Sequence, residues 1–287
     1  MIKNLTKTVG LVIVIATLAG GCRSTTEYKK LTEAGSKYTT AVNVLLLKAG
    51  DIRINATSEQ LLKDDRITNQ TVANYEKLSQ LDEKRLDILN DIRIHNQLLQ
   101  SYFSKLQELA NSDAPEQTKT AIDDISNNLN AVGKKLQESS LIANKGLIKG
   151  GASLIIDSKI HGALREELEK RNQTIRQELT IQKEVLNALG ESMQQDVELI
   201  KSAQEERLVI RPLTQSEPIS KEDEWIQTRN RILSMNKKIA EVKSASTALG
   251  EFQDIYEASV QGKLSIAHLN NVLQDIDSFI ALVENNK

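Results

Sequence analysis

Apolar side chains recur at alternating steps of three and four residues along nearly all of the chain beyond residue 30. This spacing places them on one face of an α-helix, because a helix has 3.6 residues per turn. The apolar stripes occupy residues 31–56, 78–109, 122–143, 160–208, 232–256 and 266–283. The chain is therefore predicted to consist mainly of long amphipathic helices.

Composition and the free energy of apolar burial extend this prediction to the fold class. Aromatic residues make up 3% of the chain and only 3 residues are proline, whereas β-sandwiches and barrels use more aromatic, β-branched and turn residues. Burial stabilises by about 25 cal/mol per Å² of apolar surface, so the stripes should pack together. Short connections favour antiparallel neighbours. We predict an all-α fold, an elongated antiparallel bundle of five or six long helices with coiled-coil-like packing.

Proline-containing breaks divide the predicted helices. Asp113 can cap a helix that begins with Pro115 and Glu116. Residues 211–218 contain two of the three prolines, and Ser220 can cap the helix that follows. The expected organisation is a main bundle over residues 27–210, a proline-containing linker over 211–220 and C-terminal helices over 221–287 that pack on the bundle.

The amino-terminal segment has the three-part pattern of a secretory signal. Lys3 and Lys7 form a short basic start, Val9 to Ala19 form an apolar run, and two glycines follow. The apolar run is shorter than the roughly 20 residues that a membrane-spanning helix needs. We predict that residues 1–21 are a signal peptide that is removed.

Cys22 is the only cysteine of the chain, and it follows Leu18-Ala-Gly-Gly21 directly. These residues resemble the lipobox of bacterial prolipoproteins. The resemblance, which covers residues 1–23 only, implies cleavage between Gly21 and Cys22, a diacylglycerol on the Cys22 sulfur and an acyl chain on its new amino group. Membrane lipid is then a direct partner through Cys22, and residues 22–26 form a short tether. No other cofactor is expected.

Arg23 follows the cysteine. In the lipoprotein class, aspartate at this position is the familiar signal for retention in the inner membrane. By resemblance, Arg23 favours anchoring in the outer membrane of the cell envelope, with the periplasmic face preferred to the cell surface.

Residues 144–156 differ from the rest of the mature chain, since they combine three glycines and several apolar residues with only two lysines. One interpretation is a hairpin connection whose apolar residues cover the end of the bundle. A second is a close helix crossing through Gly146 and Gly150. A third is an apolar tip that touches lipid or a partner, a layout similar to that of helical pore-forming toxins. The residues of this candidate tip are Gly146, Leu147, Ile148, Gly150, Gly151, Leu154, Ile155 and Ile156.

Catalytic motifs are absent from the sequence, so the protein is not expected to be an enzyme. With Cys22 committed to lipid, no thiol remains as a nucleophile or zinc ligand. Two Asp-His pairs spaced by four residues, Asp91 with His95 and Asp157 with His161, could hold a metal if their helices faced each other. The alternative is that these are surface pairs or histidines at the edge of the core.

Other polar residues have structural interpretations. Arg85 interrupts an apolar stripe, either as a buried contact that fixes helix register or as a packed stem whose guanidinium reaches solvent. The doublets Asp123-Asp124 and Glu166-Glu167 are expected in ion pairs or on solvated faces. Trp225, the only tryptophan, is expected to hold its helix against the bundle, with an interface anchor as the alternative.

These observations favour a non-catalytic, lipid-anchored scaffold or protein-binding module of the cell envelope. Its helical faces would bind an envelope protein or a second copy of the chain. The formal net charge of −2 argues against a nucleic-acid partner. The alternatives are a membrane-active protein with an apolar tip at 144–156 and a metal-binding helical bundle.

Overall fold

The computed structural model of this chain describes residues 6–63, 70–111, 115–141, 154–158, 160–214 and 216–263, and the backbone at positions 267, 270, 271, 274 and 278. Side chains are described from Leu31 onward, excluding Pro115 and residues 236–248. All regular secondary structure in these ranges is helical, which confirms the predicted all-α class.

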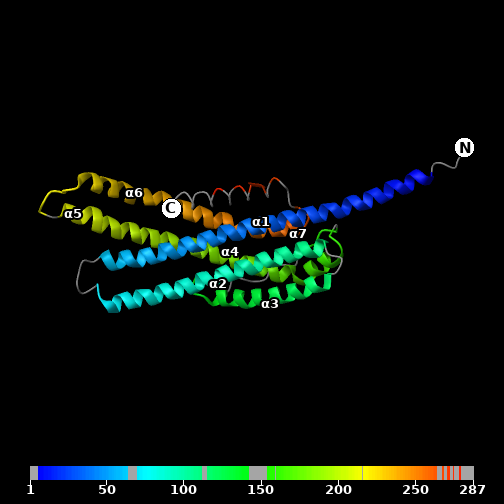
Figure 1. The fold of residues 1–287 in the computed structure, drawn as a ribbon, viewed down its shortest axis with the longest axis horizontal. Coiled ribbons are helices and arrows are strands. Elements are labelled where there is room, and N and C mark those ends of the chain that lie inside the picture. The colour runs from blue at the N-terminus through cyan, green and yellow to red at the C-terminus, as the bar shows by residue number, and fades with distance from the viewer. Residues whose placement is uncertain are drawn as a thin grey trace.

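The helices run back and forth along one long axis (Figure 1). In chain order they are α1 (Thr6–Lys63), α2 (Val72–Asn111), α3 (Pro115–Glu138), α4 (Gly162–Gln204), the π-helical turn η1 (Glu205–Ile210), α5 (Arg211–Leu213), α6 (Glu222–Gly250) and α7 (Phe252–Val260). The elongated antiparallel bundle predicted from the stripes is therefore what the described residues form. Pro115 begins α3, as its fixed backbone angle favours at a first helical position.

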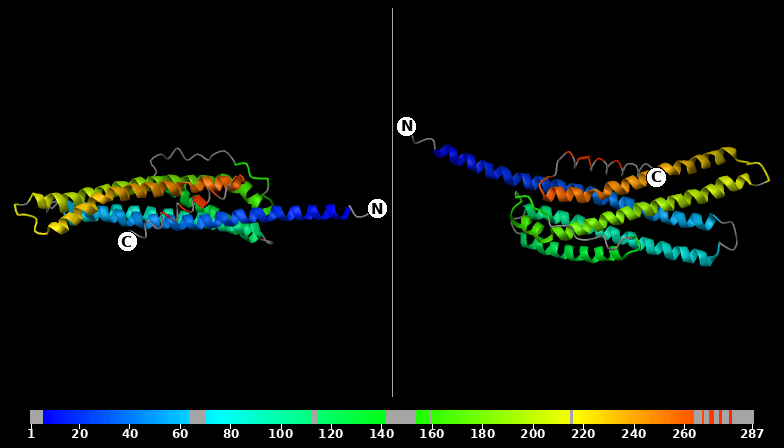
Figure 2. Two further views of the ribbon diagram at one scale, coloured as in Figure 1. Left: turned by 90° about the horizontal axis from the view of Figure 1, so that it is seen from above. Right: turned by 180° about the vertical axis from the view of Figure 1, so that it is seen from behind.

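The two ends of the bundle differ (Figures 1 and 2). The amino-terminal part of α1 projects beyond the other helices at one end, where the described residues 154–158 also lie. The chain passes from α1 to α2 and from α5 to α6 at the opposite end. We call this opposite end the distal end.

Helix α4 lies at the centre of the bundle, because it packs against α1, α2, α3, α6 and α7. A helix with neighbours on several sides buries residues on more than one of its faces. Accordingly, Glu167, Arg171, Glu178, Gln182 and Asp196 of α4 are buried together with its leucines and isoleucines. Some of the charged residues that separate the apolar residues of α4 therefore lie in the core.

Most of the described aromatic rings form one cluster. Tyr38 of α1 stacks on Phe252 of α7 with ring centroids 4.5 Å apart, and Phe103 of α2 meets Phe252 edge to face at 5.4 Å. Phe103 also contacts Tyr102 and Tyr256. In a chain with so few aromatics, this cluster is where α7 is fastened to the α1–α2 pair.

Gly262 ends α7. Its φ of +66° is left-handed, and Lys263 N–H donates to the Ala258 carbonyl at 2.8 Å, the arrangement of a Schellman motif. A Cβ at Gly262 would collide with the carboxylate of Asp157, whose N–H donates to the Val260 carbonyl at 3.0 Å. The segment before α4 is therefore held against the end of α7.

The helix that contains α4 continues through η1 and α5 to Leu213, three residues into the predicted linker. Pro212 has no N–H for the Leu208 carbonyl, so ordinary α-helical bonding cannot pass this point. The backbone adopts π-helical geometry just before it, where Arg211 N–H donates to the Glu206 carbonyl. Beyond α7, the predicted apolar stripe at 266–283 lies outside the described side chains, while Ala267, Asn270, Asn271, Gln274 and Ser278 are helical and exposed.

Candidate functional site

The backbone of α1 passes without a break from Thr6 through Gly21 and Cys22 into the bundle. Leu31, the first residue with a described side chain, is already in the core with 1% of its surface exposed. At 1.5 Å per residue, a helix brings residue 22 to roughly 14 Å from Leu31. Within the described residues, no helix is long and apolar enough to cross a bilayer.

The candidate tip is described only at its end. Gly146, Leu147, Ile148, Gly150 and Gly151 lie outside the described residues. The side chains of Leu154 and Ile156 are partly buried against the core, whereas Ile155 between them is 87% exposed. This alternation leaves one large apolar side chain in solvent at the end from which α1 projects.

The two Asp-His pairs proposed as metal ligands have separate partners. Asp91 accepts from Lys135 Nζ at 2.8 Å. His95 is fully buried, and His161 is exposed just before α4. No group of three His, Cys, Asp or Glu residues suited to a metal ion occurs in the part of the chain that the structure describes.

His95 is the centre of a buried polar layer. Its Nδ1 lies 2.7 Å from Gln182 Oε1 and its Nε2 lies 3.0 Å from Glu178 Oε2, so both ring nitrogens are occupied. Gln182 Nε2 donates to Asn96 Oδ1 at 3.4 Å, and Asn96 Nδ2 donates to the Thr39 carbonyl at 3.1 Å. We call these five residues the His95 layer. It joins α1, α2 and α4 across the core.

Gly133 of α3 completes the His95 layer. A Cβ at this position would overlap Oε2 of Glu178. The missing side chain therefore makes the space in which the Glu178 carboxylate reaches the histidine. Tyr38, which precedes Thr39 in the chain, also faces the layer, because its side chain hydrogen-bonds Gln182. Burial raises the pKa of the Tyr38 phenol.

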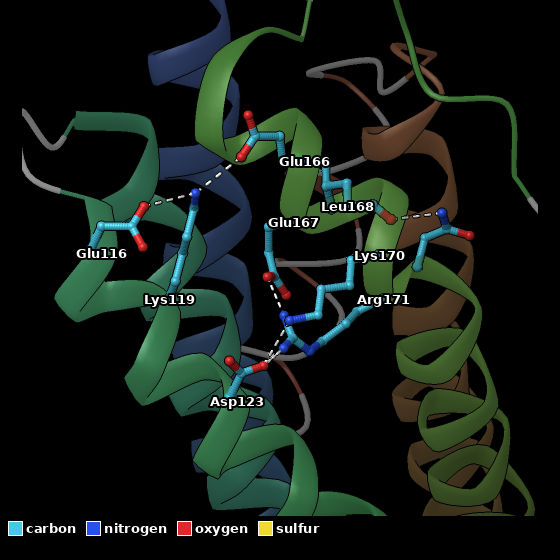
Figure 3. A network of polar contacts seen from close by, with 9 residues as sticks. Glu116, Lys119, Asp123, Glu166, Glu167, Leu168, Lys170 and Arg171 are labelled. Carbon is cyan, nitrogen blue, oxygen red and sulfur yellow. Dashed lines mark hydrogen bonds and ion pairs between the residues drawn. The ribbon is translucent and has the colours of Figure 1, made fainter.

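A second polar network joins α3 to the start of α4 (Figure 3). Lys119 lies between two carboxylates, with Nζ 3.2 Å from Glu116 and 3.0 Å from Glu166. Arg171 pairs with Glu167 on its own helix and with Asp123 of α3. Both acidic doublets thus contribute ion pairs, as the sequence predicted.

Glu167 is 3% exposed, and one of its carboxylate oxygens, Oε1, is buried without a hydrogen-bond partner among the described residues. Burial raises the pKa of this carboxyl from 4.5 to about 7, while the ammonium groups of Lys170 and Lys119 act in the opposite direction. Burial also lowers the pKa of Arg171. The charges of the Glu167–Arg171 pair are therefore the part of this network that is most sensitive to pH.

A third network, nearer the distal end, is built around Arg53 of α1. Its Nε donates to Asp82 of α2 at 2.9 Å and its Nη1 donates to Asp196 of α4 at 3.0 Å. Thr57 donates to the other Asp82 oxygen at 2.6 Å. Burial raises the pKa of Asp196, and Arg53 opposes that shift. One arginine thus joins three helices.

Arg85 lies beside the Arg53 network. Burial lowers the pKa of its guanidinium, and Asp196 opposes that shift. Its Nη1 is buried with no hydrogen-bond partner among the described residues. Because Arg85 is only partly buried and its Nη1 makes no hydrogen bond among the described residues, neither interpretation of Arg85 is confirmed.

Closest to the distal end, Glu59 of α1 joins the last turns of α4 and η1. Arg207 Nη2 donates to Glu59 Oε2 at 2.8 Å, and Gln204 Nε2 donates to Glu59 Oε1 at 2.8 Å. Arg231 of α6 donates to Gln204 Oε1 at 3.1 Å. Together with the Arg53 network and the His95 layer, these bonds fix the register of the helices along the bundle.

The distal end carries an open groove, lined by both apolar and polar residues, between the end of the α4–η1–α5 helix and the start of α6. It has two adjoining hollows of about 340 and 540 Å³, which share several lining residues. The shared residues are Pro212, Glu217, Pro218, Ile219 and Trp225. We call this feature the Trp225 groove.

Trp225 connects the two walls of the groove. Its indole Nε1 donates to the Val209 carbonyl of η1 at 3.2 Å, which confirms that this residue holds α6 against the bundle. Two neighbouring apolar side chains remain open to solvent, since Leu213 is 60% and Ile226 48% exposed. The groove was not predicted from the sequence, although the proline-containing linker holds apolar residues that could have indicated it.

Comparisons with protein-family models, with curated proteins and with solved structures gave no match to this chain. Its function must therefore be inferred from the arrangement of its own residues.

Proposed function

We propose that this chain is a lipid-anchored lipoprotein of the bacterial cell envelope that acts without catalysis, as a helical scaffold or protein-binding module. Cys22 carries the diacylglycerol and acyl chains, and the preferred location is the periplasmic face of the outer membrane. The partner is an envelope protein or a second copy of the chain.

One observation carries the proposal: α1 contains residue 22 at one end of the bundle and continues to Lys63 near the other (Figure 1). At 1.5 Å per residue, a helix from residue 22 to residue 63 spans roughly 60 Å. With α1 upright on the membrane, an anchor at Cys22 would hold the distal end well away from the lipid. Polar networks that fix the register of the helices suit a rigid support of this kind.

The anchoring is tested by the variant Cys22→Ala, with Ser24→Ala as the matched control. Loss of the sulfur removes the site of lipidation, so Cys22→Ala should lose palmitate label and leave the membrane fraction, while Ser24→Ala keeps both. Unchanged membrane residence of Cys22→Ala, without label, would defeat the proposal.

The exposure of Ile155 favours a second candidate function, contact of the membrane-side end with lipid. A membrane-active protein with a tip at 144–156 would cause leakage of dye from liposomes. The variant Ile155→Asp should abolish leakage, whereas Ile226→Asp, which changes an exposed isoleucine at the distal end, should not. Absence of leakage from the wild-type protein at every concentration would reject this candidate.

A further inference from the structure

Apolar and acidic side chains both line the Trp225 groove; we call the apolar residues its apolar floor and the acidic residues its acidic edge. Leu208 contributes apolar surface to one hollow and Leu213 and Ile226 to the other, while Pro212 and Ile219 line both. The hollows have the size of ordinary ligand sites, which occupy roughly 300–1,000 Å³. Exposed apolar residues that gather around a depression are a feature of interaction sites.

The charged residues that line the groove are mainly acidic. Glu217, Glu222 and Glu224 supply three carboxylates, and Lys221 supplies the single ammonium group. Lys221 Nζ is already 3.1 Å from Glu224, so its charge is balanced within the groove. A ligand that enters will therefore meet an excess of negative charge.

The excess of negative charge in the groove determines which kind of ligand can bind there. Anionic lipid headgroups and nucleic acid are repelled by the carboxylates, whereas lysine or arginine side chains are attracted. The apolar floor requires aliphatic or aromatic side chains on the same ligand. An amphipathic segment with basic residues beside its apolar face meets both requirements, and helices of this type bind in grooves through regularly spaced apolar anchors.

We propose that the Trp225 groove binds a cationic amphipathic segment of a partner protein. This inference rests on the proposed function, because it names the site and the partner chemistry of the protein-binding module. The groove lies at the end opposite to the projecting part of α1 (Figures 1 and 2), where a partner can approach without meeting the bilayer.

The tryptophan makes the groove directly observable. Trp225 is the only tryptophan of the chain, so all tryptophan emission reports on this position. The full mature protein, in a non-ionic detergent, is titrated with two tryptophan-free amphipathic peptides of equal length, one of leucine and lysine and one of leucine and glutamate. The leucine–lysine peptide should shift the emission saturably, and salt should weaken its binding. The leucine–glutamate peptide should give no saturable shift.

Charge variants test the role of the acidic edge. Removing two carboxylates with Glu217→Gln and Glu222→Gln should weaken binding of the leucine–lysine peptide about three- to tenfold, since an exposed charge contributes up to about 1 kcal/mol. The matched control, Glu191→Gln with Glu198→Gln, removes two exposed charges from the C-terminal third of α4, outside the groove, and should leave binding unchanged.

Three outcomes would overturn the inference: equal binding of both peptides, equal weakening by both pairs of variants, or emission that depends on protein concentration without peptide, which would show that a second copy fills the groove. The titration does not depend on where Cys22 is attached. Failure of the anchoring experiment and failure of this one are therefore distinguishable.

Discussion

Gly133 provides the sharpest test of the His95 layer. In the variant Gly133→Ala, the new Cβ would occupy the position of Glu178 Oε2. The carboxylate must then move from a site in which it lies 3.0 Å from His95 Nε2, inside a fully buried layer. The substitution adds one methyl group on α3 and thereby tests a contact between α2 and α4.

The expected effect follows from two opposing terms. Loss of a hydrogen bond to a charged group costs about 1.5–3 kcal/mol. Alanine in place of glycine within a helix offsets about 1 kcal/mol of that loss. Gly133→Ala should therefore lower the free energy of unfolding by about 0.5–2 kcal/mol.

The matched control is Gly50→Ala on α1, where the added Cβ would meet the flexible end of Leu86 at 3.2 Å. That variant should unfold at the same or a slightly higher urea concentration than the wild type, as followed by helical circular dichroism. In a Glu178→Ala background, Gly133→Ala should no longer destabilise the protein. If Gly133→Ala is as stable as Gly50→Ala in the otherwise unchanged chain, the reasoning about the layer is wrong.

The α3–α4 network and the Arg53 network give further predictions. Because the pKa of Glu167 rises from 4.5 in the unfolded chain to about 7 in the fold, the folded state binds its proton more tightly, and stability should fall by about 2–3 kcal/mol as pH rises from 4.5 to 7. Urea midpoints across this range should show the slope, and Glu167→Gln should reduce it; an unchanged slope would contradict the assignment. The variant Arg53→Met leaves Asp82 and Asp196 without their shared partner and should cost on the order of 3 kcal/mol in the same assay. Lys105→Met, which breaks an exposed pair with Glu108, should cost less than about 1 kcal/mol, and equal losses would refute the distinction.

The fold class was predictable from the stripes, because local spacing in the sequence alone decides whether apolar residues share one face of a helix. Leu31, Val42, Leu45 and Ala49 are buried where the pattern placed them. His95 and Arg85 interrupted the stripe of α2. His95 lies beside Glu178 and Gln182 in a buried layer, so the polar residue at this core position was a correct signal of buried partners. Arg85 is partly buried, and its Nη1 has no hydrogen-bond partner among the described residues.

The partners themselves could not be identified from the sequence. Glu178, Gln182 and Asp196 look like surface residues of a charge-rich helix, and only the central position of α4 buries them. Which helix becomes surrounded by the others depends on the three-dimensional arrangement, because the spacing of an apolar stripe does not identify the helix that it packs against. The Trp225 groove could not be predicted for a related reason, because its walls come from helices on either side of the proline-containing linker and meet only in the folded structure. The assignments of Cys22 and of residues 144–156 stay predictions.

The polar networks also determine when the bundle can become fixed during folding. The bond from Arg53 to Asp196 joins residues 143 positions apart, and those from Glu59 to Gln204 and Arg207 span 145 and 148 positions. Contacts this distant form late, because a long loop must close first. An α1–α2 hairpin that emerges early from the ribosome can already form its own polar bonds, from Arg53 and Thr57 to Asp82. It lacks the groups of the second half of the chain that Arg53 and Glu59 also bind, so these two side chains gain their full set of partners only when Asp196, Gln204 and Arg207 arrive.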